Sequence, residues 1–528
     1  MLKQIKVFIV IMVAGIGFSH ASDTTKRDSL ELRKAHALVL PKLDSLVLLQ
    51  KLKEYNSPII RFTDGFYTSP AMKYYSRNSS LTELNVGYTA DKQGRYEMQQ
   101  GDCGQRFGFD TEAFLKHNGK DALWGSAAYS NGKRKNVLWN ETSDYSIVAP
   151  YVMADTVGGD LSYEEYSFSG GYGVQLGKTM LGLSGKYRAL LEYRDIDPRP
   201  KNVVSDLEFE FGASRALNQK YQLAIGLSAR KYTQQNSMKF YSQLGAPMVY
   251  HMTGLGTDNK LFAGSKMDNS YSGGGYGFQV QLAPKDKIGL FSSLEYRDFS
   301  FEKTTRIALQ ALPMAELKSK RWKGELAYLL GDQERQYGLK LAAGNEQRNG
   351  VEAKFDNRGQ DNFVKIASSN NYRNEQSAFR LTGIYNVQKQ KSLSWQVLAD
   401  LGYTTDRTEY VDPARSMDFS AITGGLNVGL TKVVGKSLWQ AAVGGLISKN
   451  TNATRSWSDL NTSSAVYRML ENNYAYHISD YQQLNLSARW DYPLKNGMGI
   501  SLKSAYSYTA FNSKYTGNQF LLTGGITF

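Results

Sequence analysis

The sequence predicts an all-β protein, a transmembrane antiparallel β-barrel of about 18 strands (16–18) with a short helical N-terminal arm. Three observations predict it. Side chains alternate between apolar and polar through most of the chain, which is typical of strands that have two different faces. Short turns alternate with longer connections. The composition combines 35 Tyr and 49 Gly with a mean hydropathy of −0.44, as expected when only one strand face meets lipid.

The first 21 residues have the pattern of a cleaved signal peptide. Lys3 and Lys6 precede an apolar run at 7–18, and Ser19-His20-Ala21 is a small-x-small cleavage site. Beyond it, no apolar stretch approaches the ~20 residues that a membrane helix needs. We therefore expect export and a location in the cell outer membrane, crossed by strands.

Residues 22–80 are not strand-like. Apolar residues recur at spacings of three and four in 30–40 and 42–53, with Pro41 between, which predicts two short amphipathic helices. We expect this region to form a helical arm in the periplasm or a partial plug of the barrel, and we favour the packed arm. The barrel itself is predicted to span 81–528.

The strands are marked by alternation and by turn signals. Between 181 and 194, Leu183 and Tyr187 alternate with Lys186 and Arg188, so we expect the first pair to face lipid and the second the lumen. Turns are predicted at Asn118-Gly119, Gly177-Lys178, Asn218-Gln219, Pro284-Lys285-Asp286, Gly331-Asp332, Gln388-Lys389-Gln390, Gly435-Lys436 and Lys495-Asn496-Gly497. Long outer loops are predicted at 131–160, 234–270, 349–371 and 450–472.

The last residues, 498–528, contain two alternating strands and end on the aromatic Phe528. This ending resembles the C-terminal assembly signal of bacterial outer-membrane β-barrels. The resemblance implies two partners, the barrel-assembly machinery during biogenesis and the lipids of the outer membrane.

The charge and cysteine content narrow the class of protein. The net charge is +14, but Lys and Arg are scattered rather than clustered, so we expect lipid headgroups and not nucleic acid as the partner. The single cysteine, Cys103, cannot form an internal disulfide. Only 11 Pro occur and no linker divides the chain, which favours one large closed sheet over several domains.

A motif occurs twice. Ser169-Gly170-Gly171-Tyr172-Gly173 precedes 191–195 (Leu-Glu-Tyr-Arg-Asp), and 272–277 precedes 294–298 with the same five letters. Duplication of a hairpin would produce this pattern and would place two acid and base pairs on the lumen face, near the outer ends of their strands. These candidate residues are Glu192, Arg194, Glu295 and Arg297. We favour ion pairs that stiffen the wall over a charged constriction that selects solute.

The loop 131–160 holds the other candidate binding residues. They are Trp139, Asn140, Glu141, Asp144, Tyr151 and Asp155. Carboxylates beside aromatic rings can hold a sugar or a calcium ion. The same groups can also brace the pore if the loop folds inward, and we favour bracing.

Catalytic residues are not apparent. The four histidines after residue 21 lack metal-ligand spacing, and no Gly-x-Ser-x-Gly motif occurs. Gly177-Lys178-Thr179 lacks the earlier glycine of a phosphate loop, because that position is Tyr172. We therefore expect no enzyme activity, no metal and no cofactor.

Several segments carry a resemblance. Trp-Gly-Ser-Ala-Ala-Tyr-Ser-Asn-Gly at 124–132 is followed by Trp-Asn-Glu-Thr-Ser-Asp-Tyr at 139–145 and Asp-Thr-Val-Gly-Gly-Asp at 155–160. They resemble an uncharacterised family of Gram-negative outer-membrane β-barrels of gut-type anaerobes, a domain of unknown function. The resemblance implies a barrel in the outer membrane. A weaker similarity links Ser69-Pro70-Ala71 to the N-terminal turn of the long-chain fatty-acid transporter family.

Three classes of function follow, in order of preference. The first is a channel or transporter for small solutes across the outer membrane. The second is a non-conducting barrel that scaffolds or assembles a cell-envelope partner. The third is an outer-membrane hydrolase.

Overall fold

The computed structural model describes residues 45–117, 120–242, 247–264, 268–307, 310–332, 334–358, 363–389, 393–494, 497–512 and 514–528. All of them belong to one structural unit, Leu43–Phe528. The expected signal peptide and the helix predicted at 30–40 lie outside the described residues.

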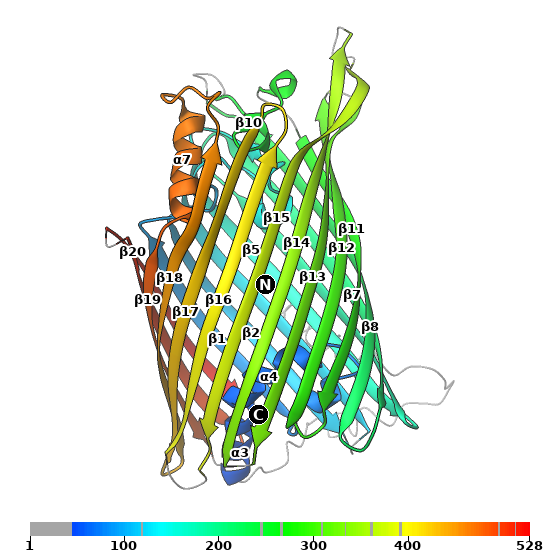
Figure 1. The fold of residues 1–528 in the computed structure, drawn as a ribbon, viewed down its shortest axis with the longest axis vertical. Helices are drawn as coiled ribbons and strands as arrows, with labels where there is room; N and C mark the ends of the chain where they lie inside the picture. The colour runs from blue at the N-terminus through cyan, green and yellow to red at the C-terminus, as the bar shows by residue number, and fades with distance from the viewer. Residues whose placement is uncertain are drawn as a thin grey trace, which may run out of the picture. The chain divides into compact units, whose positions relative to one another are not determined.

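The wall is one antiparallel sheet in which, across these described ranges, eighteen strands follow in chain order (Figure 1). The predicted strand number is confirmed. The sheet closes because β1 also pairs with β21, from Glu83 opposite Thr527 to Gln93 opposite Gly517. The wall strands are β1 (Leu81–Gln93), β2 (Cys103–His117), β3 (Asp121–Val137), β5 (Gly159–Leu176), β6 (Thr179–Tyr193), β7 (Arg199–Ala216), β8 (Tyr221–Lys239), β11 (Asp268–Pro284), β12 (Gly289–Ile307), β13 (Gln310–Gly331), β14 (Arg335–Asn357), β15 (Phe363–Val387), β16 (Ser394–Tyr410), β17 (Arg415–Val434), β18 (Ser437–Ser456), β19 (Tyr481–Pro493), β20 (Gly499–Phe511) and β21 (Tyr515–Thr527).

The two faces of each strand follow the sequence alternation. On β6, Leu183 and Tyr187 are exposed on the outside, whereas Arg188 reaches a carboxylate inside the barrel. Large apolar side chains are exposed in this way on every side of the barrel. Such a surface is stable in hydrocarbon, where a closed barrel leaves no backbone group unpaired. The protein is therefore an outer-membrane β-barrel.

Aromatic side chains mark both membrane interfaces. Trp395, Tyr385 and Trp439 are exposed near the end with short turns, and Phe379 and Tyr403 are exposed farther along their strands. From Trp395 to Tyr403 the strand climbs roughly 20 Å at ~3.3 Å per residue and a tilt of about 40°. This height agrees with an apolar band of about 25 Å between two aromatic girdles.

All four predicted long loops are wrong in part, because the neighbouring strands extend into each of them. The segment 349–371 is mostly strand, because β14 and β15 continue as a hairpin that extends above the barrel (Figure 1). The segment 450–472 contains the end of β18 and the start of a helix, α7 (Ala465–His477). Among the described residues, no helix is both long and apolar enough to cross a membrane.

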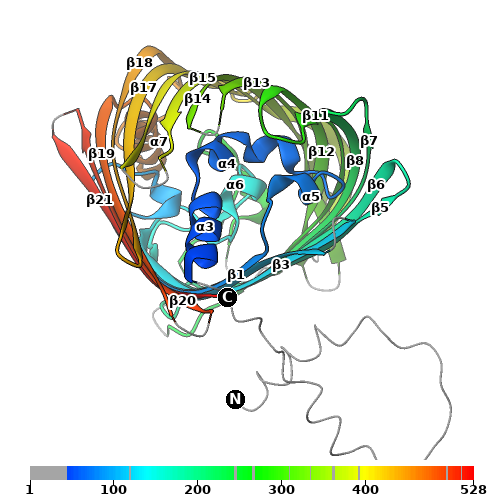
Figure 2. The same ribbon diagram turned by 90° about the horizontal axis from the view of Figure 1, so that it is seen from below.

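The N-terminal helices lie inside the ring of strands at the end with short turns (Figure 2). They are α3 (Ser45–Tyr55), α4 (Pro58–Thr63), η1 (Asp64–Tyr67) and α5 (Lys73–Ser76). The helix predicted at 42–53 is thus confirmed as α3. Pro58 begins α4, where its missing N–H has no helical partner to lose.

Candidate functional site

Residues 138–158, which we call the inner loop, leave β3 and fold into the lumen (Figure 2). They contain α6 (Tyr145–Val148) and β4 (Met153–Ala154). Trp139, Asn140 and Tyr151 are 6%, 0% and 1% exposed. The loop is shorter than the predicted 131–160, because β3 and β5 continue beyond the expected strand ends.

A second loop packs against the inner loop. Met153 of β4 lies opposite His251 of β9 (Tyr250–Gly254), and β9 pairs with β10 (Thr257–Asp258). A short helix, η3 (Lys260–Phe262), follows. The buried core around them contains Val148, Tyr151, Val152, Leu190, Tyr232, Tyr271, Phe301, Leu317, Trp457 and Leu470. Protein therefore fills the outer part of the lumen.

Arg194 holds both buried carboxylates of the inner loop. Its Nη2 lies 2.8 Å from Glu141 Oε1 and 2.6 Å from Asp155 Oδ2, and none of the three side chains is more than 1% exposed. Asp155 Oδ1 also accepts the backbone N–H groups of Val157 and Gly158, each at 2.6 Å. One guanidinium thus faces two carboxyl groups without water, which is costly unless one carboxyl is neutral.

The pKa shifts identify the neutral group. Burial raises the pKa of Glu141 well above its usual value, and the adjacent Asp155 adds to the rise. Burial also disfavours the ionised form of Asp155, but hydrogen bonds from Glu141 and Arg194 lower its pKa overall. These shifts favour the protonated form of Glu141, and with that proton the triad of Glu141, Asp155 and Arg194 has no net charge.

Asp144 fixes the start of α6. It has the left-handed backbone conformation, with φ of 52°, and its Oδ2 lies 2.5 Å from Arg188 Nη2. The hydroxyl of Tyr232 donates to the same oxygen at 2.9 Å. Behind them, Arg230 pairs with Asp206 at 2.7 Å. The inner loop is therefore tied to β6 and β8.

Side chains of the opposite wall hold the inner loop through hydrogen bonds to the backbone carbonyls of the loop. Arg348 on β14 donates to the carbonyls of Ile147 and Ala149, both at 2.7 Å. Tyr271 on β11 donates to the carbonyl of Tyr151 at 2.9 Å. The inner loop thus spans the lumen from β6 to β14.

The four charged residues of the repeated motif separate into two groups. Glu192 is 2% exposed and accepts hydrogen bonds from Arg134 Nη2 at 2.5 Å and from Ser143 Oγ at 2.9 Å. Like Arg194, it therefore holds the inner loop. Glu295 and Arg297 lie on the wall, where Arg297 pairs with Glu295 and, at 2.9 Å, with Glu208.

The strand register differs between the two copies of this motif. Gly171 lies opposite Ser184, so residues 191–195 continue outward beyond the glycine run. Gly275 lies opposite Phe299, so residues 294–298 sit level with the glycine run or on its periplasmic side. The copies are not equivalent hairpins, and only the first places its charges at the outer end of a strand.

Sequence reasoning missed several partners of the inner loop. Asn202 and Asn236 donate to the carbonyl of Glu141 at 3.0 and 2.8 Å. Both alternate with lipid-facing residues on β7 and β8, so strand alternation places them in the lumen but does not show which loop they meet.

Helix α7 was also missed. Ser464 caps its N-terminus by accepting the N–H of Tyr467 at 3.1 Å. Asn473 accepts a hydrogen bond from the N–H of Met98 at 3.1 Å and donates one to the side chain of Gln99 at 2.7 Å. Met98 and Gln99 belong to the short helix η2 (Met98–Gln100). Asn140 of the inner loop donates to the Gln99 carbonyl at 3.1 Å, so α7, η2 and the inner loop form one network.

Residues 45–76, which we call the plug segment, pack on an apolar area of the inner wall. The buried cluster contains Ile59, Phe62, Phe66, Tyr67, Met72, Ala224, Ala283, Phe291, Ala327, Leu329 and Ile384. The hydroxyl of Tyr67 donates to the Pro284 carbonyl at 2.5 Å, and Lys340 holds the Phe62 carbonyl near the end of α4 at 3.0 Å. Apolar wall residues inside a barrel are stable here because the helices cover them.

Four glycines lie in a row across neighbouring strands of the inner wall, and three of them, Gly173, Gly182 and Gly212, face the plug segment. Gly173, Gly182, Gly212 and Gly226, the glycine row, lie opposite one another from β5 to β8. A Cβ on Gly212 would lie 2.5 Å from Ser69 Oγ, and one on Gly182 would lie 2.5 Å from Ala71 N. Ser69-Pro70-Ala71 fits only because these positions have no side chain.

The inner loop does not present a cation site in the ranges that the structure describes. No group of three or more His, Cys, Asp or Glu side chains there is placed to hold a metal ion. Glu141 and Asp155 are instead committed to Arg194.

The family model described as "Family of unknown function (DUF6850)" matches residues 70–528. The chain belongs to this family. The resemblance to a domain of unknown function is therefore confirmed, and no curated protein matches the sequence.

Solved structures of outer-membrane proteins are similar to most of the length of this family member. BauA, the ferric preacinetobactin receptor of Acinetobacter baumannii, is 7% identical with a TM-score of 0.38, over 85% of this chain and 80% of that one. Fiu, the ferric-catecholate import receptor of E. coli K12, is 10% identical with a TM-score of 0.36, over 86% and 82%. The copper transporter OprC is 8% identical with a TM-score of 0.39, over 85% and 81%.

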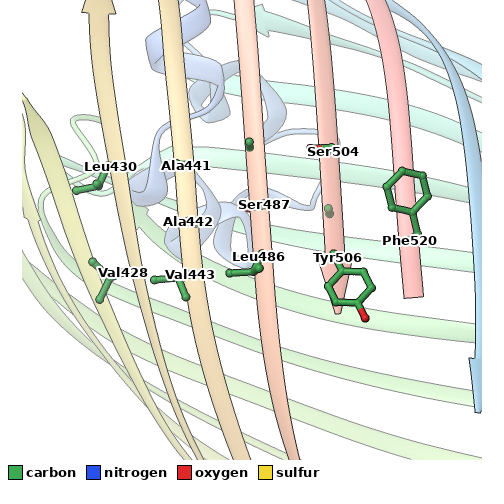
Figure 3. A pocket seen from close by; sticks show the side chains of 12 residues that line it. Val428, Leu430, Ala441, Ala442, Val443, Leu486, Ser487, Ser504, Tyr506 and Phe520 are labelled. Atoms are coloured by element: carbon green, nitrogen blue, oxygen red, sulfur yellow. The ribbon is translucent and has the colours of Figure 1, made fainter. Parts of the chain in front are cut away.

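The outer surface of this family member has a shallow apolar hollow of about 390 Å³ over β17–β21 (Figure 3). Leu430, Val443, Leu486, Tyr506 and Phe520 line it, and all five are exposed on the lipid-facing side. The hollow is part of the lipid contact, and the polar sites lie inside the barrel.

Proposed function

We propose that this protein is a gated channel or transporter for small solutes across the outer membrane, closed by the inner loop and the plug segment. The observation that carries the proposal is how the inner loop is held. Its carboxylates and carbonyls bind lumen-facing residues such as Arg188, Arg194 and Arg348. The wall does not need these contacts, because neighbouring strands pair its backbone groups.

The wall from β16 to β21 supports a hydrated path beside the two closures. Many of its inward side chains are small and polar and are partly or fully accessible. They include Thr404, Thr423, Asn427, Asn485, Ser487, Ser507 and Thr523. Such a lining binds solute weakly and suits passage better than tight binding.

A loop replacement tests the proposal. Val137 lies opposite Gly159, so a short Gly-Ser linker can replace 140–155 without moving the strands. We expect a folded, heat-modifiable barrel with higher single-channel conductance in planar bilayers than the wild type. The control shortens the β14–β15 hairpin above Lys354 and Ala367, which lie opposite each other, and is expected to leave conductance unchanged.

Two results would count against gating by the inner loop. One is a folded loop-replaced barrel with wild-type conductance. The other is an equal rise in conductance in the hairpin control, which would show that the change is not specific to the lumen.

A second candidate function, a non-conducting barrel that holds a cell-envelope partner, is favoured by the hairpin of β14 and β15. It extends above the barrel (Figure 1), and Ile366 near its tip is 61% exposed. This candidate predicts no conductance after loop replacement and a co-purifying protein that is lost when the hairpin is shortened.

A further inference from the structure

We infer that the lumen selects small anionic solutes, carboxylates or phosphates, through the side chains of Arg321, Arg380 and Lys503. This inference rests on the proposed channel function and names its class of solute. The three residues lie on β13, β15 and β20, outside the repeated motif and the inner loop.

All three cations face the lumen. Each alternates with an exposed lipid-facing neighbour, respectively Trp322, Phe379 and Leu502. Each is itself exposed, so its charged end is in the water of the lumen. Within the described ranges, none of the three has a carboxylate at ion-pair distance, whereas Arg188, Arg194 and Arg297 each have at least two.

Two of these cations stand opposite another cation. Arg321 lies across from Arg297, and Lys503 lies across from Arg489. Arg297 is already paired with Glu208, and Arg489 with Glu83 and Asp491 at 2.8 Å each.

Like charges directly opposite each other in a sheet are destabilising. The carboxylates beside Lys503, Glu83 and Asp491, already pair with Arg489. Glu346 lies opposite Arg321 on β14 but is not at ion-pair distance from it and accepts a hydrogen bond from Ser319 instead. An anion from solution removes the repulsion.

The nearest wall carboxylates bond to neutral donors. Asp400 accepts Thr382 Oγ1 at 2.7 Å, and Glu346 accepts Ser319 Oγ at 2.8 Å. Among the described residues, neither carboxylate is at ion-pair distance from Arg321 or Arg380.

The space between the two arginines is open. They lie on β13 and β15. On β14 between them, Ala342 lies opposite Arg380, Glu346 lies opposite Arg321, and Gly344 lies between these two residues. A Cβ on Gly344 would meet no atom closer than 3.6 Å. A carboxylate or phosphate can therefore approach both guanidinium groups, which bind such groups through paired N–H donors.

Selectivity is tested by the reversal potential in a KCl gradient across a planar bilayer, using the loop-replaced barrel. We expect preference for chloride over potassium, and a severalfold fall in the permeability ratio when Arg321→Gln, Arg380→Gln and Lys503→Gln are combined. The matched control, Lys436→Gln, removes one exposed charge from a periplasmic turn and is expected to change nothing.

Binding is tested separately, so that a closed barrel does not hide the result. We expect citrate, and more weakly inorganic phosphate, to raise the melting temperature of the detergent-solubilised wild type, and glucose and spermidine to have no effect. The triple variant is expected to need at least about tenfold more citrate for the same shift, and its heat-modifiable migration checks that it is folded.

The outcomes separate this inference from the proposed function. Absence of conductance, with citrate binding intact, refutes the channel and leaves the anion site standing. Potassium selectivity would overturn the inference, because the three cations would then not determine which ions enter the lumen. Equal citrate shifts in the wild type and the triple variant would also overturn it.

Discussion

Replacing Gly182 by valine should displace the plug segment without unfolding the barrel. A Cβ at this position would lie 2.5 Å from Ala71 N, well inside van der Waals contact, so Ser69-Pro70-Ala71 must move away from the wall. That movement breaks the bond from Ser214 Oγ to the Ala71 carbonyl, at 3.1 Å, and the bond from Ser69 N to Gln281, also at 3.1 Å.

The magnitude follows from these contacts. Two hydrogen bonds at about 0.5–1.5 kcal/mol each and overpacking at about 1–3 kcal/mol give a loss of roughly 2–6 kcal/mol in docking free energy. At about 1.4 kcal/mol per factor of ten, the undocked population rises at least tenfold. The strand itself should accept valine, a good strand former.

The assay combines conductance in planar bilayers with protease digestion of the purified barrel. We expect Gly182→Val to conduct more and to be cut within 45–76, while its barrel stays heat-modifiable. The control is Gly383→Val on β15, where a Cβ meets nothing within 4 Å. If both variants keep wild-type conductance and protease resistance, the glycine row is not a docking slot.

Three further predictions concern the inner loop and the wall. Arg194→Met leaves Asp155 as an unpaired buried charge at a cost of about 3–5 kcal/mol, so the inner loop should become protease-sensitive in intact cells. Continued protease resistance would contradict the role of Arg194 as an anchor of the loop. Because the pKa of Glu141 is raised in the docked loop, docking takes up a proton and should weaken as pH rises above about 4.3, the ordinary Glu value. In the wild type, protease digestion of the inner loop should therefore become faster from pH 5 to 8, and this pH dependence should be lost in Glu141→Gln. Equal pH dependence in the two proteins would refute the assignment. Leu486→Arg on the lipid face should cost roughly 2–4 kcal/mol and lower the yield of folded barrel on gels, whereas Ser487→Arg on the lumen face should not, and the reverse result would invert the assigned faces.

Strand alternation predicted the closed barrel because each wall strand contacts two different solvents. Leu183 and Arg188 were assigned to the correct faces for this reason. The same signal does not show where a strand leaves the membrane. β14 and β15 therefore continue through residues predicted as loop, because the two strands remain paired beyond the point where apolar and polar residues stop alternating.

The lumen contacts were not predictable to the same degree. Side chains that meet across the barrel, such as Asp144 and Tyr232, are brought together by the path of the inner loop, which local sequence does not fix. The motif containing Glu295 was chosen for its repetition, yet its register differs from that of Glu192. No sequence pattern distinguishes Arg321, because whether an arginine has an ion-pair partner depends on the residues of the neighbouring strands.

Helix α7 did have a sequence signal. Val466, Met469, Leu470 and Asn473 recur at spacings of three and four, and Ser464 is a favourable N-cap. The strand alternation on both sides of this segment predicts a loop, because the segment connects two strand hairpins of the barrel.

The position of the glycine row has a consequence for the order of assembly. Residues 58–72 contact the wall from β5 to β15, whereas the seam that closes the cylinder joins β1 to β21. An open, still incomplete sheet therefore already offers the surface on which residues 58–72 dock, whereas α3 packs against Leu438 of the later strand β18. A chain end that reaches this surface early becomes enclosed when the last strand pairs with the first, and no later threading through a finished pore is required.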